Sequence, residues 1–173
     1  MNTTLTIHEA TEPPEARGIT RDAVRMMVAQ GTYLVSTLSA GENVGKMARA
    51  GTLPPALAAK ALAIAEAMPR SFRLAAAAGV KIALGVDNVF DSRSHDPHEF
   101  TLLVQNGMTP MQAIQAGTKV AAELLGWEQD VGTIQPGRFA DLVAVRGDPL
   151  RDITEVERAL VVLKGGTVVK NGR

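Results

Sequence analysis

The sequence predicts an α/β fold, and three observations support this. Two short apolar segments rich in β-branched residues, 32–38 and 80–86, have the composition of buried strands. Stretches with helical periodicity precede, separate and follow them, and such alternation favours parallel strands with helices packed on them. After residue 130 the pattern changes to short strands and glycine turns. This change predicts a small antiparallel β unit over 131–173.

The first helix is expected from Thr20 to about Gln30. Thr20 is a good N-cap, because its hydroxyl can accept a bond from an unpaired amide of the first turn. Asp22 lies in that turn, where the helix dipole favours an anion. Gly31 suits the left-handed position that follows a helix. Residues 1–18 lack apolar periodicity and are predicted to form a flexible arm.

A loop and a long helix are expected between the two strands. Three glycines predict a loop over 41–51. After Pro54 and Pro55 an Ala-rich helix is expected to run to about residue 78. Pro69 is expected to break or kink it, because proline lacks an N–H group and clashes with the preceding turn.

The region after the second strand is expected to hold a polar loop over 88–97 and a helix from about His98 to Asn106. Thr109 and Gln112 fit a capping box, which predicts one further helix to about Gly126. In the β unit, Pro136-Gly137 indicates a type II turn and Gly165-Gly166 a two-residue hairpin.

Composition excludes several classes of function. Of the 173 residues 46% are hydrophobic, enough for a core, and 18 basic residues balance 18 acidic ones. This balance argues against nucleic acid and against anionic membrane surfaces as partners. No apolar run is long enough to span a membrane, and the N-terminal residues do not resemble a signal peptide. Without cysteine there are no disulfides and no thiolate sites, and we expect a cytoplasmic protein.

Asp87 is the first candidate for chemistry, because it follows an apolar strand directly. A carboxylate at the C-terminal end of a parallel strand can bind a divalent metal or accept a proton from metal-bound water. A turn or N-cap role explains its position equally simply. The following loop is crowded with His95, His98 and three acidic residues, Asp91, Asp96 and Glu99. Substrate binding by His95 is one reading, and a solvated loop that leads into a helix is the other.

Several stretches together resemble the metal-dependent amidohydrolase superfamily, within it the imidazolonepropionase and Xaa-Pro dipeptidase-like branch. The matching stretches are GTYLVSTL at 31–38, AGVKIALGVD at 78–87, NGMTPMQAIQAGT at 106–118, AAELLG at 121–126 and VGTIQPGRFADLVAVRGDPLRDI at 131–153. Their order is similar to that of the family's C-terminal portion.

The resemblance implies a partial (β/α)8 barrel over 19–130, consisting of its last two strands with their helices. It further implies that 131–173 contributes to the family's β-sandwich. It implies a hydrolase of amide, peptide or cyclic amide C–N bonds that uses water activated by a divalent metal, usually zinc. Asp87 matches the family's aspartate, a metal ligand and proton shuttle, and His95 would help to hold a small-molecule or peptide substrate.

Other features of the family are absent from the sequence. The chain has neither the His-x-His pair of the first barrel strand nor the Glu-His-Gly word that precedes a segment like 19–31. A catalytic zinc site needs at least three protein ligands. We therefore expect a truncated or degenerate family member whose missing half lies elsewhere. For the isolated chain the sequence favours a catalytically inactive remnant or interaction module.

Self-association follows as a further expectation. A complete barrel takes about 250 residues, so this chain cannot close one. Two strands taken from a barrel leave free edges and an uncovered apolar face. We expect the chain to associate with itself or with a missing N-terminal half.

Overall fold

The computed structural model describes residues 18–87 and 97–172. Its elements in chain order are α1 (Arg21–Gln30), β1 (Tyr33–Ser36), α2 (Leu38–Arg49), α3 (Pro55–Ala77), β2 (Lys81–Leu84), α4 (His98–Gln105), α5 (Pro110–Ala116), α6 (Lys119–Leu125), β3 (Leu142–Ala144), the 3₁₀ turn η2 (Ile153–Glu157), β4 (Val161–Lys164) and β5 (Thr167–Asn171). None of the helices in these described ranges has the length and apolar character needed to cross a bilayer.

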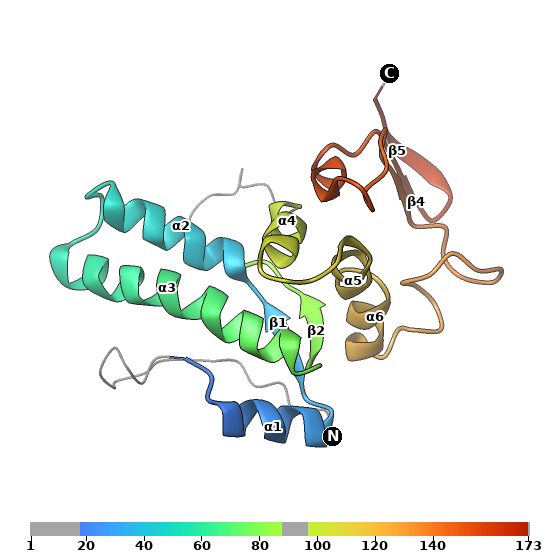
Figure 1. Ribbon diagram of the computed structural model, residues 1–173. Helices are drawn as coiled ribbons and strands as arrows, with labels where there is room; N and C mark the ends of the chain where they lie inside the picture. The colour runs from blue at the N-terminus through green and yellow to red at the C-terminus, as the bar shows by residue number, and fades with distance from the viewer. Residues whose placement is uncertain (1–17, 88–96, 173) are drawn as a thin grey trace.

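Strands β1 and β2 form a two-stranded parallel sheet at the centre of the molecule (Figure 1). The predicted parallel pairing is therefore confirmed. One face of the pair carries Leu34, Ile82 and Leu84, which pack with side chains of α3, α4 and α5. The main core lies between this face and those helices, and it includes Phe72 and the fully buried Leu103. We call residues 18–87 and 97–126 the α/β layer.

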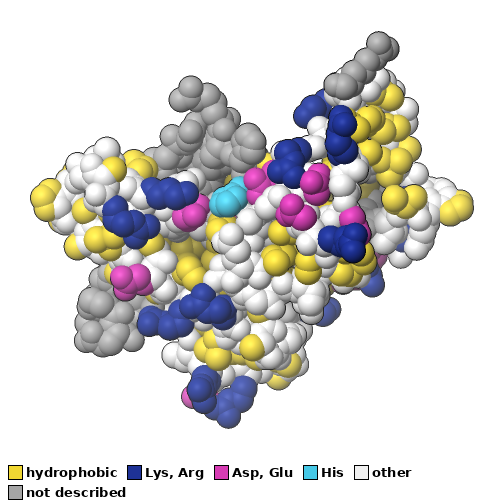
Figure 2. Space-filling model, turned by 45° about the horizontal axis from the view of Figure 1, so that its top comes forward, with side chains coloured by type: hydrophobic (Ala, Val, Ile, Leu, Met, Phe, Trp, Pro, Cys, Tyr) yellow, Lys and Arg dark blue, Asp and Glu magenta, His cyan; other side chains and the backbone are white. Residues whose placement is uncertain are grey.

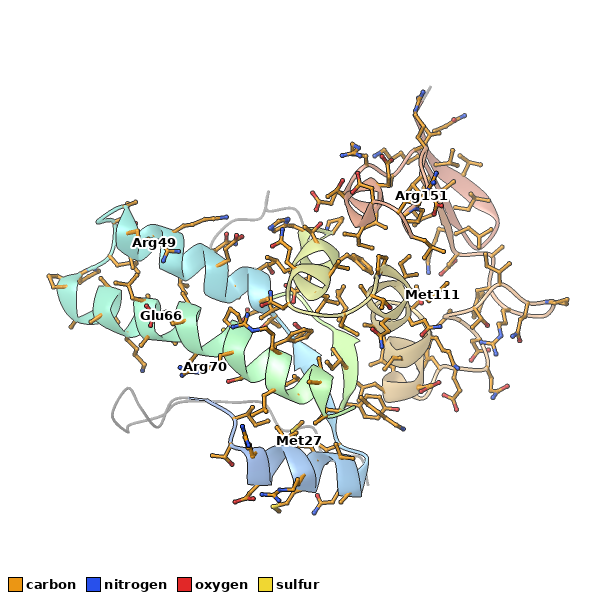
Figure 3. The ribbon with its side chains drawn as sticks, in the orientation of Figure 1. Met27, Arg49, Glu66, Arg70, Met111 and Arg151 are labelled. Atoms are coloured by element: carbon orange, nitrogen blue, oxygen red, sulfur yellow. The ribbon has the colours of Figure 1, made fainter. Side chains whose placement is uncertain are left out.

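Helix α1 confirms its predicted caps. The Thr20 hydroxyl accepts a hydrogen bond from the Ala23 amide at 3.2 Å. Gly31 has φ 66°, a left-handed conformation in which glycine has no steric penalty. Met27 points from α1 toward α3 (Figure 3), where it is buried in a second small core cluster with Ala75. This contact fastens α1 to the layer.

The loop predicted over 41–51 is wrong: most of this segment is the helix α2. Its glycines are explained by packing against α3. A Cβ atom on Gly41 would lie 2.7 Å from the sulfur of Met68, and one on Gly45 would lie 2.7 Å from the Cβ of Ala65. Glycine is needed here for two helices to approach closely, and the sequence alone does not distinguish this from a loop.

The break expected at Pro69 is also wrong, since α3 runs continuously from residue 55 to 77. Proline costs a helix one hydrogen bond and some strain, but packing on both halves can offset this. Here α2 packs along the first half of α3 and α1 along the second.

The single helix expected over 109–126 is wrong, because the structure has two helices there, α5 and α6. The division between α5 and α6 lies beside the Phe100 ring. A Cβ atom on Gly117 would lie 2.6 Å from the tip of that ring. The chain therefore turns close to α4 at Gly117, and α6 begins after Thr118. The predicted capping box at Thr109 and Gln112 is confirmed at the start of α5.

Strands β3, β4 and β5 form an antiparallel sheet in that order, as predicted for the C-terminal segment. Gly165 and Gly166, both with positive φ, form the predicted two-residue hairpin between β4 and β5. We call this the C-terminal sheet. It lies beyond α4 and α5, away from α1 and α3 (Figure 1).

The C-terminal sheet has no buried core of its own. Of the described residues after 130, Ile153 is the only buried apolar side chain, and it lies in η2 outside the sheet. Large apolar side chains are exposed here instead, including Phe139, Val143 and Val169. Figure 2 shows hydrophobic side chains gathered over this lobe.

The bare apolar face predicted for the central strands is not observed. On the face opposite the helices Tyr33 and Ala83 are buried and Val35 is half-buried. Lys81 contributes to this, because its ammonium group lies 4.9 Å from the centre of the Tyr33 ring. Six of the twelve large apolar side chains that are exposed among the described residues lie after residue 130, in the C-terminal segment.

Candidate functional site

The candidate site is the C-terminal edge of the β1–β2 pair, where Asp87 follows β2. Ser36 and Leu84 are register partners at this edge, and the Gly85 amide donates a hydrogen bond to the Ser36 carbonyl at 2.8 Å. A Cβ atom on Gly85 would lie 2.5 Å from the Cγ1 of Val35. Glycine therefore lets the chain leave β2 close against β1. Asp87 emerges exposed at the edge where parallel α/β folds place their sites.

Glu99 forms the most heavily bonded group at this edge. Its side chain is fully buried, and its carboxylate accepts hydrogen bonds from the Ser36 hydroxyl at 2.7 Å and from the amides of Leu38 and Ser39, each at 2.8 Å. These amides belong to the first turn of α2, which has no side-chain cap from Thr37. Glu99 thus caps α2 from another helix and joins α4, α2 and the end of β1.

This arrangement corrects the interpretation of Glu99 as a solvated residue. The sequence placed Glu99 at the solvated start of a helix; α4 does start at His98, but Glu99 points into the core. Its three donors satisfy the carboxylate, so it is not free to bind a metal ion or substrate. An acidic residue in the first turn of a helix is ordinary, and nothing local in the sequence indicates that it caps a different helix.

His98 lies between two carboxylates, and no local pattern in the sequence indicates either of them. Its Nε2 is 3.4 Å from Glu42 of α2, and its Nδ1 is 3.3 Å from Glu157 of η2. The Thr101 hydroxyl also donates a hydrogen bond to Glu157. A protonated imidazole can donate to both carboxylates at once. His98, the first residue of α4, therefore lies between α2 and η2.

The remaining predicted site residues lie outside the described part of the chain. These are His95, the candidate substrate ligand, and its acidic neighbours Asp91 and Asp96. Asp87 is described, and it is not brought together with His98 and Glu99 into a ligand set.

A metal centre needs several ligating side chains close together. Within residues 18–87 and 97–172, no three His, Cys, Asp or Glu side chains are grouped so that they could hold a metal ion. Catalytic zinc requires three protein ligands and an open position. The described residues therefore do not make a metal centre by themselves.

One surface depression of about 250 Å³ lies elsewhere, between α6 and the segment that follows it. Its lining is mixed in charge, with Lys119 and Arg138 facing Glu123 and Glu128. None of the lining residues follows β1 or β2, so this depression is separate from the Asp87 edge.

Two aspartates in the C-terminal segment have lowered pKa values. The hydrogen bond from Lys164, with a second from the Gly165 amide at 2.6 Å, lowers the pKa of Asp141. Hydrogen bonds from the hydroxyl and amide of Thr154 lower the pKa of Asp152, the N-cap of η2. Both carboxylates stabilise turns and lie at the surface.

Comparison of this sequence with known protein families shows which family the chain belongs to. The model of the amidohydrolase family matches residues 5–172, nearly the whole chain. The chain belongs to the amidohydrolase family. The crystal structure of a Xaa-Pro dipeptidase with methionine in its active site is 38% identical and superposes with a TM-score of 0.82 over 87% of this chain and 37% of that one.

The curated relatives that match this amidohydrolase chain include enzymes named for different reactions. An ochratoxinase from Aspergillus niger is 34% identical over 116 residues, 65% of this chain and 24% of the relative. An adenine deaminase from Moorella thermoacetica is 37% identical over 82 residues, 47% of this chain and 13% of the relative. The chain thus spans a quarter or less of these relatives, and the family resemblance found in the sequence is confirmed.

Proposed function

We propose that this chain forms the C-terminal part of a metal-dependent hydrolase of C–N bonds in amides, peptides or cyclic amides. Its contribution is Asp87, as one ligand of a divalent metal, preferably zinc, and as proton shuttle, with His95 holding the substrate. The observation that carries the proposal is the place of Asp87. In a chain of this family, it leaves the C-terminal edge of a parallel strand pair with an exposed carboxylate.

The other metal ligands are proposed to come from polypeptide that is not among the described residues. Two independent features of the structure support this. The described residues hold no ligand set for a metal, and the C-terminal sheet exposes its apolar side chains instead of burying them. Both deficits are met at once by an N-terminal part that supplies ligands and the remaining strands of the sandwich.

A covalent chimera tests this proposal. The part of the Xaa-Pro dipeptidase that precedes its match to this chain is fused to residues 19–173. We expect the chimera to bind stoichiometric zinc and to hydrolyse an Xaa-Pro dipeptide. Asp87→Asn should lower kcat by about a hundredfold to ten-thousandfold. Asp22→Asn is the matched control, since Asp22 is exposed on α1 and pairs with Arg25 at 2.5 Å.

Two outcomes would contradict the proposal. A folded chimera that takes up no zinc, or an Asp87→Asn variant with full turnover, contradicts it. Loss of activity in Asp22→Asn as well would indicate damage to the fold and not to the site.

The second candidate function is that of a catalytically inactive remnant or interaction module, and it concerns the isolated chain. The observation that favours it is the lack of a metal-ligand group in the described part of the chain. We expect the isolated chain to bind no zinc in equilibrium dialysis and to associate with itself or with an N-terminal half. A monodisperse species with the mass of one chain at micromolar concentration in light scattering would contradict the association.

A further inference from the structure

The C-terminal sheet is attached to the α/β layer mainly through the turn η2. Strands β3, β4 and β5 contact one another extensively, whereas the extensive contact with the layer is made by η2 against α4. Ile153 and Val156 of η2 pack on the main core, where η2 contacts α4. The chain that leads into the sheet also touches the layer where Gly132 lies against Ala122 of α6.

The polar part of this attachment is centred on Glu157. Its carboxylate accepts a hydrogen bond from the Thr101 hydroxyl and lies 3.3 Å from the Nδ1 of His98, and both partners belong to α4. Among the described residues, Glu157 therefore places a charged group where the C-terminal segment meets the layer.

Contacts inside the C-terminal segment hold η2 to the sheet. Glu155 accepts a hydrogen bond from the Gly147 amide at 3.2 Å and pairs with Arg158 at 2.7 Å. After Arg158, the Leu160 amide donates to the Ala144 carbonyl at 2.8 Å, which joins the end of the turn region to β3. If η2 leaves α4, these bonds let it move together with the sheet.

We propose that η2 and the C-terminal sheet undock from the α/β layer as one unit, and that the contact of Glu157 with Thr101 and His98 is the latch. Segments with few buried apolar contacts open below the free energy of global unfolding, in cooperative units. The sheet has this property, because none of its side chains is buried, so undocking of the unit exposes from the core of the layer mainly Ile153 and the half-buried Val156 of η2. A hinged sheet can also adjust its position to meet added strands, a consequence that rests on the proposed function.

Native-state hydrogen exchange on the full chain, followed by mass spectrometry, tests the latch. We expect amides of β3, β4 and β5 to exchange with one common opening constant, larger than that of β1 and β2. Glu157→Gln should raise that constant about tenfold, because it weakens hydrogen bonds to a charged acceptor. Thr101→Val removes one donor to the same carboxylate and should raise it about threefold.

Two controls separate opening of the sheet from a general loss of structure. The amides of Leu38 and Ser39 bond to Glu99 within the layer and should keep their protection in both variants. Glu155→Gln changes the same turn on a side chain that does not bond to α4, and its amide oxygen can still accept from the Gly147 amide, so the common opening constant should stay unchanged within the error of the measurement.

Three outcomes would overturn the proposal. One is an equal rise in exchange throughout the chain, which indicates global unfolding. The second is a different opening constant for each strand of the sheet. The third is unchanged protection of the sheet in both latch variants. None of these measurements depends on metal or substrate, so they stand apart from the test of the proposed hydrolase.

Discussion

The α/β layer and the C-terminal sheet differ in where they keep their apolar side chains. Every buried apolar residue of the described chain except Ile153 lies before residue 131, in the layer. In the sheet, Val143 is 63% and Val169 is 62% exposed. Burial of apolar surface is the main favourable term in folding, so the layer holds most of the stability. The comparison shows that an antiparallel sheet forms in this chain although β5 is exposed along its length and the side chains of β3 and β4 are at most half-buried.

The largest effect is expected from the buried carboxylate of the layer. Glu99→Ala leaves a buried hydroxyl and two buried amides without their acceptor, and we expect a loss of about 3–5 kcal/mol in the free energy of unfolding. Urea denaturation measures it. Glu66→Ala, at an exposed position of α3, is the control and should change stability by less than about 0.5 kcal/mol. Equal stability of the two variants would mean that Glu99 does not hold the layer together.

Truncating one apolar side chain in the layer and one in the sheet compares how much each region contributes to stability. Leu103 is fully buried in α4, and Leu103→Ala should cost about 2–4 kcal/mol through lost burial and a cavity. Val169→Ala, in the exposed sheet, should cost less than about 0.5 kcal/mol. Thermal unfolding of both variants checks this. A costly Val169→Ala would show that the sheet face is covered in solution, for example by a second copy.

The close contact between α2 and α3 predicts whether Gly45→Ala raises or lowers the free energy of unfolding. Gly→Ala in an exposed helix stabilises it by about 1 kcal/mol. At Gly45 the added methyl group would meet the Cβ of Ala65, so we expect Gly45→Ala to destabilise the chain by about 1–2 kcal/mol. Urea denaturation provides the measurement. Stabilisation by this substitution would mean that α2 and α3 do not pack closely at this point.

The smallest effect is expected in the sheet, as a dependence on pH. Lys164 and the Gly165 amide lower the pKa of Asp141, so the ionised form is favoured in the folded state. Stabilisation by this group is complete above the ordinary pKa of aspartate and is lost as pH falls through the lowered value. Amides of β4 and β5 should therefore lose protection in acid. In Asp141→Asn this loss should be absent, and an identical acid response in the variant would exclude Asp141 as its cause.

The sequence by itself determined the elements whose signals are local. The Thr20 cap with its closing glycine, the capping box at Thr109 and the Gly165-Gly166 hairpin need only neighbouring residues, and the structure confirms all three. Alternation of strands and helices was also enough to predict the parallel pairing of β1 with β2. In these cases the bonds that stabilise the element are made within a few residues of chain, or follow from the order of elements.

Only the tertiary structure decided the features that depend on partners distant in sequence. Gly45 lies inside a helix at its close contact with Ala65, whereas Gly117, which is equally close to Phe100, follows the end of one. Glu99 is a buried cap and not a solvated acid, because α4 brings it to the first turn of α2. The candidate site shows the same division: the sequence predicted Asp87 directly after a strand, and only the structure shows that no metal-ligand group forms around it among the described residues. Local patterns carry no information about such partners, because the distances between them are set by packing of the whole chain.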